Sequence, residues 1–517
     1  MGKRRNRELI FYVSENTELV TYQKNGDRKY NFLCRERKKG NLQKCEDDPC
    51  FLLDLLKSFL ESVQNNVDNL IIDAKLGEEE KQVFRYYNQR IYLSNLVGVV
   101  AIRNHVFQSK LFDATIQICT RLDAGISDNS IELGNCSDNI FNPEKPYFLN
   151  TLLFGEIQSL SNSFVKSSDD YLSNLLLFSF IEKYKEAYAT KGYFKNYHSF
   201  KGNDYKLKGS IDIARHINLN AGLNNGKVAY SYKEKSENNF LNHLIVEAYE
   251  CLKRKNNSQA NQVLAIHRDL KESLESLKYI IKFPEYSRRI LISKNINSLS
   301  NPYFTEYEDL RRICIKILRN EGLSPISGSQ HEEVEGILMY VPRLWEKFIE
   351  KYLSGVSYKA QDEIKVFSAM NNGVFGTSTF PDYVFYEGKR PFMILDAKFK
   401  PGWLNAVKTG NISDILRPDY DKCLRDMVSI NSSITGVIFP VKERIEYCED
   451  GFMIDNQKYY YMHSISEYNT RTEFFTFPVS IPEITGNYEA WRIALDRQNS
   501  YLFSIISKII RAHKPIV

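Results

Sequence analysis

The spacing of apolar positions changes twice along the chain, and these changes predict three regions. Residues 1–165 combine short strand-like runs with a helical apolar period over 51–63, so we expect a mixed α+β region. Residues 166–325 carry mainly helical patterns. Residues 326–517 return to a mixture of helices and strands, and the Gly-, Ser- and Pro-rich stretch 322–330 marks where this last region begins.

In the last region the pattern predicts a helix, a strand, a hairpin, a helix and a strand, in that order. A helical apolar stripe covers 332–353, and Pro342 inside it should kink the helix or reset its start. Two aromatic-rich runs, 383–386 and 392–399, flank a turn-like insert and predict a β-hairpin. The remaining pattern predicts a strand before the hairpin, at 364–369. After the hairpin it predicts a polar loop at 401–418, a helix at 420–431 and a buried strand at 435–441. This order predicts an α/β core with the hairpin at its centre.

Composition is typical of a soluble folded protein. Although 43% of residues are hydrophobic, no apolar stretch reaches the length of about 18 residues that a membrane span needs. The basic N-terminus lacks the apolar segment of a signal peptide, and the nine cysteines are scattered, so we expect a cytoplasmic protein. The 69 Lys and Arg against 64 Asp and Glu leave a net charge of only +5, so nucleic-acid binding would depend on local basic clusters.

Charged residues interrupt the apolar hairpin at two points. Pro381-Asp382 stands before the first strand, and Asp396-Ala397-Lys398 lies in the second. Side chains alternate faces along a strand, so Asp396 and Lys398 should point to the same side, with Asp382 beside Asp396 across the hairpin. An acid and a lysine at the end of an apolar run are costly to bury unless they coordinate something.

A third acid, Glu346, lies on the helix before the hairpin, and Glu350 one turn later could compete for its role. A hard cation such as Mg²⁺ takes oxygen ligands and makes water a usable nucleophile near neutral pH. We therefore expect Glu346, Asp382 and Asp396 to be metal ligands, and Lys398 to position the water, for phosphodiester cleavage. The alternative interpretation is a surface hairpin with a buried Asp–Lys ion pair.

The Asp-Ala-Lys triplet alone is a weak signal, because the chain contains it twice. Leu-Ile-Ile-Asp-Ala-Lys at 70–75 nearly repeats the later copy, but it continues into Gly-Glu-Glu-Glu, a solvated charge run. We interpret Asp73 and Lys75 as a structural or accidental match. The later copy is distinguished by Asp382, Glu346 and the order of the elements around them.

The ordered series of helix-Glu, Pro-Asp and Asp-x-Lys resembles the PD-(D/E)XK nuclease superfamily, and within it the McrC family of McrBC-type restriction systems. Leu-Trp-Glu-Lys-Phe at 344–348 is similar to the family's Leu-Phe-Glu motif, and Lys-Gly-Ser-Ile-Asp at 208–212 to its Arg-Gly-x-hydrophobic-Asp segment. Three shorter segments also resemble the family: Asn-Phe-Leu-Asn at 239–242, Asn-Pro-Tyr at 301–303, and the Leu-Val-Gly-Val strand within 93–100.

The resemblance implies a PD-(D/E)XK domain over 326–517, with a mixed central sheet flanked by helices, that cuts DNA with Mg²⁺. It also implies an McrB-like AAA+ GTPase ring as the partner, which reads modified DNA and which this subunit stimulates. The chain has no Gly-x-x-x-x-Gly-Lys-Ser/Thr loop, so GTP should be bound by the partner. Residues 1–165 are then the expected docking region for the ring.

The chain departs from the family at the helix after the catalytic strand. The family's Asp-x-x-Gln is replaced by Asp419-Tyr-Asp-Lys422, so either Lys422 or Asp421 takes the supporting role, or it is absent. The relation could therefore be to a divergent branch that includes LlaJI-type restriction subunits. Two functional alternatives remain: a non-catalytic adaptor that activates an AAA+ partner, and a stand-alone PD-(D/E)XK nuclease.

Overall fold

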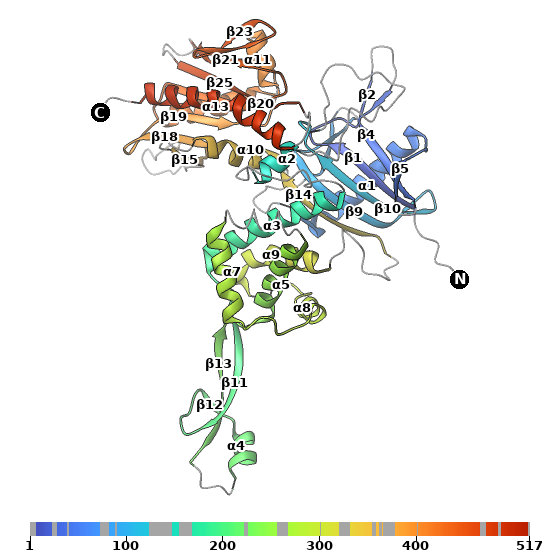
Figure 1. The fold of residues 1–517 in the computed structure, drawn as a ribbon, viewed down its shortest axis with the longest axis vertical. Coiled ribbons are helices and arrows are strands. Elements are labelled where there is room, and N and C mark those ends of the chain that lie inside the picture. The colour runs from blue at the N-terminus through green and yellow to red at the C-terminus, as the bar shows by residue number, and fades with distance from the viewer. Residues whose placement is uncertain are drawn as a thin grey trace, which may run out of the picture. The chain divides into compact units, whose positions relative to one another are not determined.

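The computed structural model forms two compact units, Met1–Asp170 with Ser327–Val517, and Tyr171–Ile326 (Figure 1). Its fold class is mixed α/β. None of the described helices is long and apolar enough to cross a membrane. The structure describes these residues: 7–22, 28–38, 41–72, 82–87, 90–123, 147–154, 168–221, 226–255, 267–299, 301–319, 331–353, 358–360, 364–365, 378–400, 402–465, 472–483 and 488–514.

The first unit contains a seven-stranded sheet that is mostly antiparallel. Its strands lie in the order β5 (Asn41–Lys44), β4 (Phe32–Lys38), β1 (Arg7–Ser14), β10 (Lys110–Cys119), β9 (Leu96–Phe107), β14 (Glu333–Tyr340) and β6 (Leu70–Ile72). Helix α1 (Pro49–Asn65), which covers the predicted helical period, packs on this sheet and buries Leu55, Leu56 and Phe59 completely. Asp48 begins α1 by accepting hydrogen bonds from the amides of Cys50 (3.0 Å) and Phe51 (3.2 Å).

Residues 332–353 do not form the single long helix that their apolar stripe predicts. Their first part is β14, which pairs antiparallel with β9 and parallel with β6. Helix α10 (Val341–Glu350) begins directly afterwards, with Pro342 in its first turn, where a missing N–H is tolerated. Pro342 therefore resets the helix start, and the apolar positions before it belong to a buried strand.

Gly98 lets β9 and β14 approach closely. Its φ is +149°, and a Cβ at this position would lie 2.0 Å from the carbonyl oxygen of Ile337 on β14.

We expect Gly98→Ala to lower the free energy of unfolding by about 3 kcal/mol, because the backbone strain and the steric clash both destabilise the folded state. Gly388→Ala is the matched control, since Gly388 also has a positive φ (+60°) but has open space around it; it should cost only about 1 kcal/mol. Urea denaturation measures both, and equal losses would contradict the role of the close approach.

A second sheet of six strands in the same unit is mixed. Its strands lie in the order β15 (Tyr358–Ala360), β18 (Tyr383–Glu387), β19 (Arg390–Ala397), β20 (Ile434–Val441), β25 (Thr472–Ser480) and β24 (Met462–Ile465). The β19–β20 and β20–β25 pairs are parallel, and the others are antiparallel. Helices α10 and α12 (Arg417–Ser429) contact β19, and α11 (Trp403–Thr409) and α13 (Tyr488–Ala512) contact β25.

The prediction of a loop over 401–418 is wrong at α11. This helix buries Trp403, Leu404 and Ala406 and ends at Gly410, whose φ is +66°. Seven residues are too few for a clear helical period, so the sequence pattern did not reveal the helix. The predicted helix at 420–431 and the buried strand at 435–441 are confirmed as α12 and β20. Of the predicted strand at 364–369, only β16 (Ile364–Lys365) is described, and the early Asp73-Ala-Lys copy lies outside the described residues.

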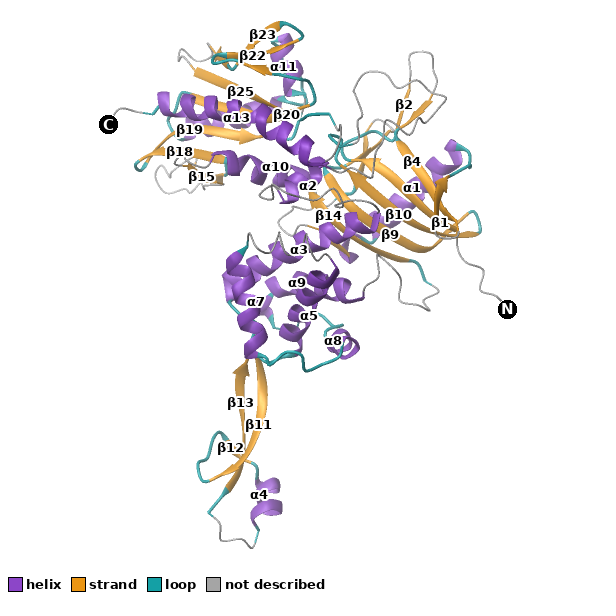
Figure 2. Cartoon of the chain, viewed as in Figure 1, coloured by secondary structure: helices purple, strands orange, loops and turns teal. Residues whose placement is uncertain are grey.

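The second unit is mainly helical, with one long extension that we call the arm, residues 196–236. Its helices are α3 (Ser168–Lys191), α5 (Phe240–Lys255), α7 (Arg268–Ile280), α8 (Arg288–Lys294) and α9 (Glu306–Arg319). The arm leaves these helices as a two-stranded ribbon (Figure 2), made of β11 (Asn196–Asp204) and β13 (Val228–Ser236). Strand β12 (Ser210–Ile211) and helix α4 (Ile213–Asn220) lie at its far end.

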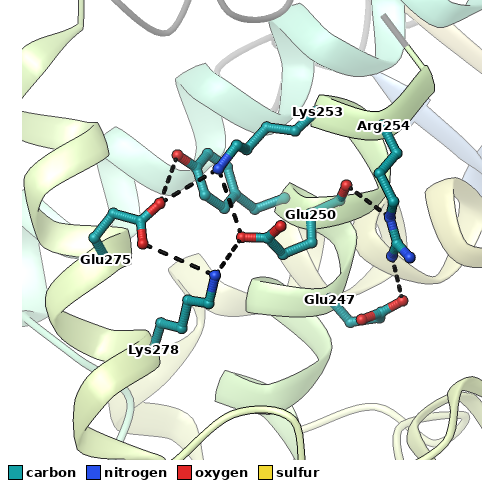
Figure 3. Close-up of polar contacts among 7 residues, drawn as sticks. Glu247, Glu250, Lys253, Arg254, Glu275 and Lys278 are labelled. Carbon is teal, nitrogen blue, oxygen red and sulfur yellow. Dashed lines mark hydrogen bonds and ion pairs between the residues drawn. The ribbon is translucent and has the colours of Figure 1, made fainter. Parts of the chain in front are cut away.

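Charged side chains bridge α5 and α7 on the surface of the second unit (Figure 3). Glu250 contacts Lys278 at 2.9 Å, and Glu275 contacts Lys253 at 3.5 Å. Partly exposed pairs of this kind contribute about 0–1 kcal/mol each. The contact between the two helices therefore rests mainly on buried apolar side chains, such as Val246 and Leu277.

Candidate active site

The β18–β19 hairpin brings Asp382 and Asp396 together. Its turn is shorter than the predicted 387–391 insert, because β18 continues to Glu387 and β19 begins at Arg390. Tyr383 pairs with Leu395, so continuing the register by one residue puts Asp382 beside Asp396. The Asp382 carboxylate also accepts a hydrogen bond of 2.7 Å from the amide of Ala397, which holds it against the end of β19.

Two lysines contact the Asp396 carboxylate, which is only 1% exposed. The Lys398 ammonium lies 2.6 Å from Oδ2, and the Lys422 ammonium donates to Oδ1 at 3.1 Å. Lys398 lies one residue beyond the end of β19 at Ala397, not inside the strand as predicted, but its ammonium does reach the same side as the Asp396 carboxylate. Lys422, from α12, is the residue that reaches the carboxylate, whereas Asp421 is exposed.

The two aspartates have opposite electrostatic environments. Burial, followed by the charges of Asp396 and Glu346, raises the pKa of Asp382 well above its ordinary value. Burial also acts to raise the pKa of Asp396, but Lys398 and Lys422 together hold it below the ordinary value. Asp382 thus favours its neutral form and Asp396 its charged form. This difference is expected for two neighbouring carboxyl groups when the two ammonium groups contact only one of them, Asp396.

Glu346 faces the same site from α10. The apolar face of α10 buries Trp345 and Phe348, which leaves Glu346 half-buried beside the hairpin. The Tyr383 hydroxyl donates to the backbone carbonyl of Glu346 and fixes this turn of α10 against β18. Glu350, the competing acid, is exposed, so Glu346 is the acid of this helix that acts on Asp382.

The described residues contain no group of three or more His, Cys, Asp or Glu side chains arranged to hold a metal ion. Glu346, Asp382 and Asp396 therefore gather without forming a complete set of metal ligands, and ammonium groups lie against both oxygens of Asp396. The donor chemistry nevertheless fits a hard cation, because carboxylate oxygens are what Mg²⁺ prefers. A cation would also favour the charged form of Asp382, whose pKa burial and the neighbouring acids raise.

Sequence reasoning missed the polar residues that support Lys422. Asp426, one turn further along α12, lies 3.7 Å from the Lys422 ammonium and accepts a 2.7 Å hydrogen bond from the Thr379 hydroxyl. Asp426 is 1% exposed, and Cys423 packs with its Sγ 3.7 Å from Asp396. The four-residue spacing of Lys422 and Asp426 on a predicted helix was the available signal.

Comparison with known proteins adds a family and two solved structures. A family model described as McrBC 5-methylcytosine restriction system component matches residues 91–414, which is more than half of the chain. A refined half-complex from the tetradecameric assembly of Thermococcus gammatolerans McrB AAA+ hexamers with bound McrC contains a similar chain, with 15% identity and a TM-score of 0.39 over 94% of this chain and 99% of that one. The Thermococcus gammatolerans McrBC complex contains another, with 14% identity and a TM-score of 0.26 over 68% and 89%. No curated protein matches.

Proposed function

The chain belongs to the McrBC 5-methylcytosine restriction system component family, and from this premise we propose that it is the McrC-like, Mg²⁺-dependent DNA endonuclease subunit of a restriction system. The observation that carries the proposal is the close group of Asp382, Asp396 and Lys398 at the end of the β18–β19 hairpin. In this proposal residues 326–517 are the PD-(D/E)XK nuclease domain. The family match ends at residue 414. It therefore includes Glu346 and the hairpin residues Asp382, Asp396 and Lys398, but not Lys422.

Each polar side chain of the site has a role in the proposed cleavage. Glu346, Asp382 and Asp396 would hold Mg²⁺, which supplies a Lewis acid and lowers the pKa of a coordinated water. Lys398 positions the attacking water and offsets the negative charge that develops on the phosphorus oxygens. Lys422 keeps Asp396 ionised and oriented, and so takes the supporting role of the family's glutamine. Burial of Asp396 strengthens all of these interactions, because little water screens them.

One observation favours a second candidate, the non-catalytic adaptor. Lys398 and Lys422 already satisfy both oxygens of Asp396, as they would in a purely structural ion pair. A structural pair, however, gives no reason for Asp382 to be buried beside Asp396, where its charge is disfavoured. Burying an acid that must give up its charge there costs stability, and this cost favours the nuclease over the adaptor.

Cleavage of defined DNA tests the proposed function. The protein is assayed on methylated and unmethylated duplexes, with and without its AAA+ partner and GTP, in Mg²⁺ or in EDTA. We expect cutting that requires the partner, GTP and Mg²⁺. Stimulated GTP hydrolysis without cutting would establish the adaptor instead, and cutting without any partner would establish a stand-alone nuclease.

The arm offers a partner-binding surface in addition to residues 1–165, and we propose that it contacts the AAA+ ring. Its far end exposes several large apolar side chains: Tyr205 (73% exposed), Leu207 (50%), Ile211 (50%), Ile213 (68%) and Ile217 (57%). Clustered exposed apolar residues of this kind are typical of interaction sites. The segment 208–212 that resembles the family motif lies in this part of the arm, where Gly209 has a φ of +77° and Asp212 caps α4.

Replacing an exposed apolar residue of the arm should weaken partner binding without unfolding the protein. We expect Ile213→Asp to reduce affinity for the AAA+ ring at least about tenfold, since a charge is placed in an apolar contact. Tyr279→Asp is the control, because Tyr279 on α7 is 87% exposed but lies outside the arm. Calorimetric titration with the partner measures both variants. Unchanged binding by Ile213→Asp would leave residues 1–165 as the docking region.

A further inference from the structure

The turn that follows β10 in the seven-stranded sheet reaches the end of the catalytic strand. Arg121 in this turn donates a hydrogen bond of 2.6 Å to the backbone carbonyl of Phe399, the residue after Lys398. Its guanidinium also lies over the Phe399 ring, 5.0 Å from the centroid. The amide of Lys398 itself donates to the carbonyl of Ile438 on β20 at 2.8 Å. The backbone is therefore held on both sides of the Lys398 side chain.

A buried carboxylate holds Arg121 in place. Glu15, which is completely buried directly after β1, accepts a hydrogen bond from the Arg121 amide at 3.0 Å and lies 3.8 Å from the guanidinium. Strands β1 and β10 are parallel neighbours in register to their ends, so Glu15 and Arg121 leave the same edge of the sheet. The Arg121 side chain is only 17% exposed. Removing both charges of such a pair from water costs free energy, so a gain in stability alone does not explain the pair.

The same turn also anchors the aromatic cluster beside the site. Asp123 accepts hydrogen bonds from the amides of Phe148 (2.7 Å) and Leu149 (2.9 Å), and so caps α2 (Tyr147–Phe154). The Phe148 ring stacks on Phe399 and contacts Trp345 of α10, which precedes Glu346. The segment that carries Lys398 thus contacts this turn directly, and the segment that carries Glu346 packs against α2, which the turn caps.

We propose that Arg121 is a positioning residue that fixes the Phe399 carbonyl, sets the orientation of Lys398, and links the seven-stranded sheet to the nuclease centre. The inference rests on the proposed nuclease function. A guanidinium is suited to this role, because it can donate to a carbonyl in a fixed direction while its planar face covers an aromatic ring. Lysine would retain the charge opposite Glu15 but would lose this geometry.

The experiment compares variants of the full chain, assembled with the AAA+ partner, in steady-state cleavage of methylated DNA. We expect Arg121→Lys to lower kcat between about ten- and a hundredfold with KM for DNA unchanged, since a displaced catalytic group slows chemistry rather than binding. GTP hydrolysis by the partner and the melting temperature should stay near wild type. Arg103→Lys is the matched control, because Arg103 is similarly buried (12% exposed) and paired with Glu8 in the same sheet.

Two variants of Glu15 separate positioning from folding. Burial raises the pKa of Glu15 to about 7, so a neutral amide is close to a form the native protein already tolerates. Glu15→Gln keeps a side-chain oxygen that can accept from the Arg121 amide, so Arg121 stays in place and cleavage should be within twofold of wild type. Glu15→Gln with Arg121→Met removes both charges of the pair and should show the same kcat loss as Arg121→Lys.

Wild-type kcat in both Arg121 variants would overturn the inference, as would a loss matched by weaker DNA binding or by unfolding. Failure of the wild-type complex to cut would overturn the proposed function first.

Discussion

Asp396→Asn is expected to abolish DNA cleavage, with a loss of at least about a hundredfold. The substitution keeps the shape of the side chain but removes the charge that two ammonium groups contact at 2.6 and 3.1 Å. It should also destabilise the protein by about 2–4 kcal/mol, because Lys398 then loses the carboxylate it pairs with and Lys422 keeps only Asp426, at 3.7 Å. Cleavage under single-turnover conditions and thermal melting measure the two effects.

Asp382→Asn makes an informative comparison with Asp396→Asn. It should lose cleavage to the same extent, since Asp382 is the second proposed ligand. It should cost little stability, because burial and the neighbouring acids already disfavour its charged form. The control is Asp496→Asn, which breaks a 2.9 Å pair with Arg492 on α13 and should lower stability while leaving cleavage intact. Full cleavage by the Asp396→Asn complex would contradict the catalytic assignment.

The site was predictable from the sequence to the extent that it depends on local order. Asp382, Asp396 and Lys398 belong to one hairpin, and strand alternation alone places them together. Glu346 could be expected nearby, because α10 directly precedes the strands of the same sheet. Its distinction from Glu350 required the structure, since the face that α10 buries is set by Trp345 and Phe348 packing against Phe148 of α2.

Features that depend on partners distant in sequence could not be predicted. β14 reads as part of a helix, because its residues 336–339 are all buried, and a continuous buried run shows no alternation. The contact of Arg121 with Phe399 joins residues 278 positions apart, and no local pattern encodes it. The exposure of the apolar side chains of the arm could not be predicted either, because the sequence alone does not distinguish an exposed apolar residue from a buried one.

The roles of the two lysines can be separated, and this gives the second large effect that we expect. Lys398→Met should reduce cleavage at least about a hundredfold while DNA affinity stays within a few-fold, because Lys398 acts on the attacking water and the developing charge. Lys422→Met should reduce cleavage only about tenfold, since Lys398 still holds Asp396. Filter binding and single-turnover cleavage distinguish the two outcomes, and equal losses in both variants would contradict the division of roles.

Replacing both lysines at once tests the metal site without relying on activity. The double variant leaves Asp396 buried with no cation beside it, and this should cost about 3–5 kcal/mol in the absence of metal. Adding Mg²⁺ should then raise the melting temperature of the double variant more than that of wild type. A ligand that binds only the native state stabilises that state, and in the variant Mg²⁺ no longer competes with two ammonium groups for Asp396. If Mg²⁺ had no greater effect on the double variant than on wild type, the acids would not be metal ligands, and the Asp396–lysine contacts would be a structural ion pair.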